Sequence, residues 1–86
     1  MVTIKIIFGT DWCGDCKRTK KFLEEYKILY EWKDIDIDDQ AREEAIKLNK
    51  GKPKVPTIVF SDDTILIEPK NNQIAEKLGI EYKEMI

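Results

Sequence analysis

The stretch from Val2 to Phe22, VTIKIIFGTDWCGDCKRTKKF, joins an apolar run, two cysteines and a basic segment without a break. Its first part is rich in β-branched residues with little polar alternation, which predicts a strand over residues 2–8 that is buried on both faces. After the cysteines, apolar residues recur at helical spacing, so we expect an amphipathic helix from about Gly14 to Tyr26. Cys13 and Cys16 therefore stand where a strand passes into a helix.

The next segment, YEWKDIDID at residues 30–38, alternates isoleucine with aspartate. This pattern predicts a strand whose two isoleucines lie on an apolar face while the aspartates face water. A helix should follow it, with Asp38 or Asp39 as the N-terminal cap and Gly51 at its end. The other acids of this region are interpreted as solvent-facing rather than as a divalent cation site.

The last third of the chain contains two apolar runs, VPTIVF and TILIE, on either side of a short SDD turn. Their closeness predicts an antiparallel hairpin. Pro69 precedes a final helix, about residues 70–78, which Gly79 should end.

The predicted order is βαβαββα in one domain that covers residues 1–86. It places the protein in the α/β class, with a four-stranded mixed sheet and three flanking helices. We expect the two helical connections to join parallel strands and the hairpin to add antiparallel pairing.

Composition and charge narrow the function classes. The net charge of −2 argues against nucleic acid as a partner, because nucleic-acid binding usually shows as a basic domain. The N-terminus lacks the pattern of a secretory signal, and its apolar run is far shorter than the roughly 20 residues that span a bilayer. We therefore expect a cytoplasmic, monomeric protein that binds neither nucleic acid nor membranes.

The chain has two cysteines and no histidine, which limits what the cysteine pair can do. Structural zinc takes four ligands, and one chain supplies only half of them. A disulfide across so short a loop would stabilise the fold little. Three interpretations remain open: thiol–disulfide chemistry, which we favour, an iron–sulfur cluster that uses the same cysteines as ligands, and a redox-inert adaptor.

The two cysteines are expected to have different roles in thiol chemistry. Cys13 precedes the helix, where free N–H groups and the positive end of the helix dipole stabilise a thiolate, so we predict that it is the nucleophile. Cys16 lies one turn further along and can attack a mixed disulfide formed at Cys13. We predict that it is the resolving thiol.

The motifs WCGDC and KVPTIVF, together with the βαβαββα order, resemble the glutaredoxin branch of the thioredoxin superfamily, in particular its mycoredoxin-like members. The resemblance implies a thioredoxin fold and reduction of protein or low-molecular-weight mixed disulfides, with no bound cofactor and with an outside thiol or reductase as electron donor. It also implies that Pro56 follows a cis peptide bond against the cysteines and that the backbone of Val55 binds an extended substrate.

Two further residues are candidates for substrate contact. Trp12 directly precedes the predicted nucleophile, and Lys54 directly precedes the Val-Pro motif, where its charge would attract an anionic thiol or an acidic protein surface. The chain departs from the dithiol glutaredoxins at three places: Gly14 and Asp15 stand between the cysteines, Thr10 replaces a lysine, and the sequence EPKNN replaces a diglycine and the acid after it. We therefore expect glutathione to be a non-preferred donor.

Overall fold

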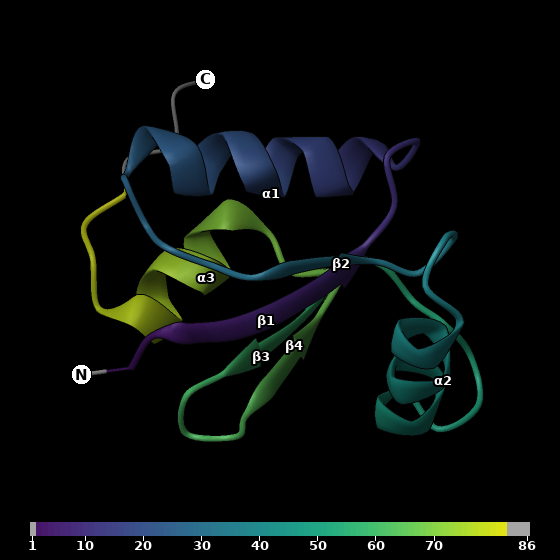
Figure 1. Ribbon diagram of the computed structural model, residues 1–86. Coiled ribbons are helices and arrows are strands. Elements are labelled where there is room, and N and C mark those ends of the chain that lie inside the picture. Colours follow the sequence, from purple (N-terminus) through teal and green to yellow (C-terminus); the bar gives the residue numbers. More distant parts are fainter. Residues whose placement is uncertain (1, 83–86) are drawn as a thin grey trace.

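The computed structural model describes residues 2–82 of the chain (Figure 1). Its elements, in order, are β1 (Ile4–Gly9), α1 (Gly14–Glu25), β2 (Trp32–Asp34), α2 (Asp39–Leu48), β3 (Thr57–Phe60), β4 (Ile65–Ile67) and α3 (Asn71–Leu78). The predicted order of helices and strands is therefore confirmed.

The four strands form one mixed sheet in the order β2-β1-β3-β4. β1 is parallel to β2, and β3 and β4 form the predicted antiparallel hairpin. The expectation that the second helical connection also joins parallel strands is wrong, because β3 runs antiparallel to β1 and hence opposite to β2. Thr57, the first residue of β3, pairs with Phe8 near the end of β1, so the chain after α2 has already returned to the end of the sheet that carries the cysteines.

Helices cover both faces of the sheet, with α1 and α3 on one side and α2 on the other (Figure 1). β1 contributes Ile4 and Ile7 to the core under α1 and α3, and Phe8 to the core under α2. The pairing of β1 with β3 shifts register between Ile4 and Ile6, and such a bulge explains why Ile4 and Ile7, at odd spacing, share a face. The prediction that the first strand is buried on both faces is confirmed.

The second strand is shorter than predicted, since it covers only Trp32–Asp34. The Asp34 side chain accepts a hydrogen bond from the backbone N–H of Asp36 at 2.8 Å, which turns the chain out of the sheet. Ile35 is buried but Ile37 is exposed, so the prediction of one apolar face carrying both isoleucines is wrong.

The ends of the helices follow capping rules, with one correction. Asp38 caps α2 by accepting the N–H of Ala41 at 3.0 Å, and Gly79 ends α3 in the left-handed conformation, both as predicted. α2 ends before Gly51, however: the left-handed residue after it is Lys50, with φ of 55°. Gly51 instead donates its N–H to the carbonyl of Ile46 at 2.9 Å, which completes a Schellman motif around a lysine.

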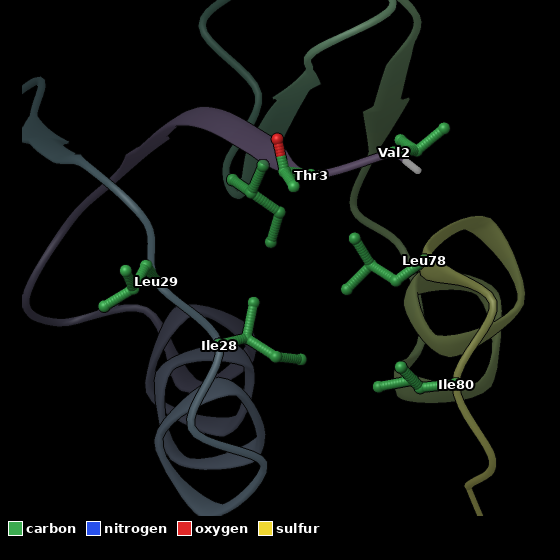
Figure 2. Close-up of a pocket in the computed structure, with 7 residues that line it drawn as sticks. Val2, Thr3, Ile28, Leu29, Leu78 and Ile80 are labelled. Atoms are coloured by element: carbon green, nitrogen blue, oxygen red, sulfur yellow. The ribbon is translucent and has the colours of Figure 1, made fainter.

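An apolar cavity of about 450 Å³ opens at the start of β1, the end opposite the cysteines (Figure 2). Side chains from β1, from the loop after α1 and from the end of α3 surround it: Val2, Thr3, Ile4, Ile28, Leu29, Leu78 and Ile80. No titratable side chain lines this cavity, so the chemistry of the molecule lies elsewhere. Within residues 2–82, no helix has the length and apolar character needed to span a bilayer.

Candidate active site

Cys13 is the N-cap residue of α1, and its backbone is still extended. Its Sγ accepts a hydrogen bond from the backbone N–H of Cys16 at 3.4 Å, and its carbonyl accepts the N–H of Lys17 at 3.1 Å. The thiol is partly exposed. A sulfur in this position is open to solvent on one side and meets the N-terminus of a helix on the other.

Cys16 lies one turn further along α1 and is fully buried. Burial raises the pKa of its thiol to about 12, and the neighbouring Cys13 adds to this rise by hydrogen bonding and charge. The backbone N–H and side-chain hydroxyl of Thr10 lower the pKa in part, because both can hydrogen bond to a thiolate. In the dithiol form Cys16 is therefore a protonated thiol at neutral pH.

The wall behind Cys16 is formed by Gly9 and Trp32. A Cβ at Gly9 would overlap the indole of Trp32 and would lie 3.1 Å from the Cys16 sulfur, so this strand position has room only for glycine. The ammonium of Lys20 lies 4.1 Å from the centroid of the Trp32 ring, on a partly buried surface. The surroundings of Cys16 are thus packed and largely closed.

The Val55–Pro56 peptide bond is cis, as the family resemblance implied. The Cys13 sulfur lies 3.9 Å from the carbonyl oxygen of Val55. Hydrogen bonds hold this segment from both sides: Thr57 donates its hydroxyl to the carbonyl of Lys54 at 2.6 Å, and Glu68 donates its N–H to the carbonyl of Pro56 at 2.8 Å. The sequence LNKGKPKVPT thus returns the chain from α2 to the face of the cysteines.

Trp12 has an exposed side chain, and its Nε1 donates a hydrogen bond to Oδ2 of Asp36. The side chain of Lys54 is also exposed and makes no ion pair within the described residues. The structure therefore brings Cys13, Cys16 and Val55 into one site, places Trp12 at its edge, and leaves Lys54 in solvent.

Four contributors to this site are not predicted as such from the sequence. The sequence singles out Thr10 only because it replaces a lysine. The sequence pattern places Trp32 in the core or at the edge of the core, and it places Asp36 among the solvent-facing acids. A glycine at the end of a buried strand often marks a close approach by another group, so Gly9 carries a usable signal. Nothing in the local pattern separates Asp36 from its neighbours. Between residues 2 and 82 no cluster of three or more His, Cys, Asp or Glu side chains is arranged to hold a metal ion.

Comparisons with known proteins agree with this geometry. The sequence profile of the Glutaredoxin family matches residues 6–65, which include both cysteines and the Val-Pro motif. The chain belongs to the glutaredoxin family. A candidate glutaredoxin of Mycobacterium tuberculosis is 35% identical over 79 residues, covering 91% of this chain and 94% of that protein. Mycoredoxin 1 of Corynebacterium glutamicum is 34% identical over 74 residues, covering 84% and 89% of the two chains.

Solved structures support the fold. The thioredoxin-like protein BC3987 superposes with a TM-score of 0.72 at 20% identity, over 88% of this chain and 97% of that one. A glutaredoxin from Archaeoglobus fulgidus gives a TM-score of 0.71 at 23% identity, over 91% and 87%. The predicted family and the predicted thioredoxin fold are therefore confirmed, and this glutaredoxin has the general activity of its family, thiol–disulfide oxidoreduction.

Proposed function

We propose that Cys13 and Cys16 form the working dithiol of a disulfide reductase, with Cys13 as nucleophile and Cys16 as resolving thiol. The observation that carries this proposal is the contrast between the two sulfurs. Cys13 is partly exposed at the start of α1, whereas Cys16 is fully buried one turn along. A substrate disulfide arriving from solvent can reach the Cys13 sulfur first.

The reaction consists of two exchanges. The Cys13 thiolate attacks one sulfur of the substrate disulfide; that bond breaks, and the departing sulfur leaves as a thiolate that takes up a proton. Cys16 then loses its proton and attacks the Cys13 sulfur, which releases the second substrate thiolate. The cysteine pair gives up two electrons and ends as a disulfide, and the substrate gains them as two thiols. An outside thiol or reductase returns the pair to the dithiol form.

The surroundings of Cys16 favour this order of events. Two of the influences that raise the pKa of Cys16 come from Cys13, through its charge and its hydrogen bond. Both disappear when the Cys13 sulfur enters a mixed disulfide, because that sulfur is then neutral and no longer a thiolate acceptor. Formation of the mixed disulfide thus makes Cys16 easier to deprotonate at the moment when it must act.

The backbone of Val55 is the proposed docking strand for the substrate, beside Pro56 and next to the exposed Lys54. Its carbonyl already lies within reach of the Cys13 sulfur. An extended segment that pairs with this backbone would bring its own sulfur close to Cys13.

We also infer that glutathione is not the preferred electron donor. Thr10, at the position of the lysine noted above, is buried against Cys16 and carries no charge. In the EPKNN segment, the side-chain oxygen of Asn71 and the carbonyl of Pro69 already accept hydrogen bonds from Arg18, at 2.6 and 3.1 Å. Losing one charge-assisted contact typically weakens binding by about tenfold or more.

Single-cysteine variants test the assigned roles. Cys13→Ser should abolish reduction of disulfides, whereas Cys16→Ser should still form a mixed disulfide and accumulate it, as seen by mass spectrometry. Trapping by Cys13→Ser but not by Cys16→Ser would reverse the roles.

Two further measurements define the function. Colour and iron content of protein purified without oxygen separate the dithiol from an iron–sulfur module that uses the same cysteines. A donor panel of glutathione, another low-molecular-weight thiol and thioredoxin reductase, each with one disulfide substrate, tests the inference on glutathione. Turnover with glutathione equal to or above that with every other donor would refute it.

A further inference from the structure

Large apolar side chains are exposed on the loop that carries Cys13 and on the turn that is hydrogen-bonded to this loop. Trp12 is 70% exposed and Ile37 is 84% exposed. A single exposed apolar residue is ordinary on a protein surface. Two of them on segments joined by a hydrogen bond, one directly before Cys13, form a candidate contact surface. We refer to Trp12, Asp36 and Ile37 together as the apolar rim.

The rim is held in place by hydrogen bonds. Asp36 accepts the indole N–H of Trp12, so the two segments of the rim are joined through this pair. The turn that carries Asp36 is itself anchored, because Ile35 donates its N–H to the carbonyl of Gly9 at 3.0 Å. Asp38 donates its N–H to the carbonyl of Asp34 at 3.1 Å, which closes the turn. The indole and Ile37 are thus presented from a fixed frame, which lowers the entropic cost of contact with a partner.

Exposed carboxylates adjoin the rim in the sequence and take part in no ion pair within the described residues. Asp11, Asp36 and Asp39 are exposed, and the ion pairs among residues 2–82 involve other acids: Asp15, Asp62 and Asp63. On the other side of Cys13, the Val55 segment carries the exposed Lys52 and Lys54. The face beside Trp12 therefore favours cationic side chains, whereas the Val55 side favours anionic groups.

We propose that the apolar rim binds a protein substrate, namely an extended segment in which the reactive cysteine is followed closely by a bulky apolar residue and by Lys or Arg. This inference rests on the function proposed above and narrows its substrate class to protein disulfides. The apolar residue covers Trp12 and Ile37, and the cation meets Asp36 and its neighbouring carboxylates. A small disulfide has neither group and gains nothing from the rim.

The test uses the full-length reduced protein and four substrates. Three are peptides whose cysteine forms a disulfide with 2-mercaptoethanol and is followed by Leu-Lys, Ala-Lys or Leu-Glu, and the fourth is bis(2-hydroxyethyl) disulfide. The measured quantity is kcat/KM for each peptide divided by kcat/KM for the small disulfide. We expect the Leu-Lys peptide to exceed each of the other two by about tenfold, the scale of one buried aliphatic side chain or one close charge pair.

Three variants assign this preference to residues. Ile37→Ser should lower the Leu-Lys ratio by about tenfold, whereas Leu29→Ser, which changes a side chain that is 91% exposed at the far end of β1, should leave it as it was. Asp36→Asn keeps an acceptor for Trp12 but removes the charge. It should therefore reduce the preference for Lys over Glu and retain the preference for Leu over Ala.

The outcomes separate this inference from the proposed function. Equal ratios for all three peptides, or an unchanged ratio in Ile37→Ser, would overturn the rim as a binding surface while leaving disulfide reduction intact. Failure to reduce any of the four substrates would overturn the proposed function and this inference with it.

Discussion

The two sides of the cysteine pair are built in opposite ways. Behind Cys16 the chain is closed, since Gly9, Thr10 and Trp32 leave its thiol no exposed surface. Around Cys13 the chain is open, with an exposed Gly14 after it and an exposed Trp12 before it. In the function that we propose, this contrast gives two cysteines of the same chemistry different roles: Cys13 has access to solvent, and Cys16 is kept protonated until Cys13 has reacted.

The sharpest test of this contrast compares two glycines. Gly9→Ala should lower the free energy of unfolding by roughly 3 kcal/mol, because the added Cβ overlaps the Trp32 indole and presses on Cys16. Gly14→Ala, on the open side, places its Cβ where no atom lies within 4 Å and should stabilise α1 by roughly 0.5 kcal/mol. Urea denaturation of the reduced proteins measures both. Similar changes in the free energy of unfolding of the two variants would mean that Gly9 is packed no more tightly than Gly14.

The closed side also predicts a dependence of stability on pH. The pKa of Cys16 is raised from 9.0 to about 12 by burial. Below pH 9 both the native and the unfolded chain carry this proton, so the Cys16 thiol does not lower the free energy of unfolding. Between about 9 and 12 only the unfolded chain loses the proton, so the native state is progressively disfavoured, by up to roughly 1.4 kcal/mol per pH unit.

The measurement is the difference in unfolding free energy between the reduced wild type and Cys16→Ala, since other groups that titrate in this range cancel in the difference. We expect it to shift against the wild type as the pH rises from 9 to 12. A difference that stays flat across this range would show that the Cys16 thiol ionises as readily in the native state as in the unfolded chain.

Local sequence patterns were sufficient for the parts of this fold that depend on neighbours in the chain. The placement of Cys13 at a strand-to-helix junction, the Asp38 cap and the stop at Gly79 all follow from a few adjacent residues. The parts that were missed depend on segments that meet only in space. Asp36 and Ile37 have the same pattern as Asp34 and Ile35, and only the turn at Asp34 separates their roles.

The direction of β3 illustrates the same limit. A strand, a helix and a strand in sequence usually imply parallel strands, but here the segment after α2 returns along the helix before β3 begins. Its anchors are specific hydrogen bonds, such as the one from the Asn49 side chain to the hydroxyl of Thr57 at 3.0 Å. A pattern of hydrophobic spacing contains no information about them.

Thr10 tests how the closed side controls the second exchange. Its hydroxyl is buried, has no hydrogen-bond partner among the described residues, and as a donor to the Cys16 sulfur would add to the effect of the Thr10 backbone N–H in lowering the pKa of Cys16. Thr10→Val keeps the shape but removes the donor, so the Cys16 thiolate is harder to form and release of the substrate from Cys13 should slow by about tenfold. Stopped-flow measurement of the first exchange, which should be unaffected, serves as the control. Slowing of both exchanges alike would place the role of Thr10 in Cys13 or in the fold.

The smallest expected effect concerns the loop between α2 and Val55, which leads to the segment beside Cys13. Lys50 occupies a left-handed conformation between α2 and Val55, and its side chain is exposed. Lys50→Gly relieves that conformation but makes the unfolded chain more flexible, so the net stabilisation should be at most about 1 kcal/mol. Lys47→Gly, in the last turn of the same helix, should instead destabilise by roughly 1 kcal/mol. Thermal denaturation should report these opposite signs. Because neither change touches the cysteines, kcat/KM for a small disulfide should stay constant in both variants. A loss of activity in Lys50→Gly would show that the geometry around Cys13 depends on the left-handed residue after α2.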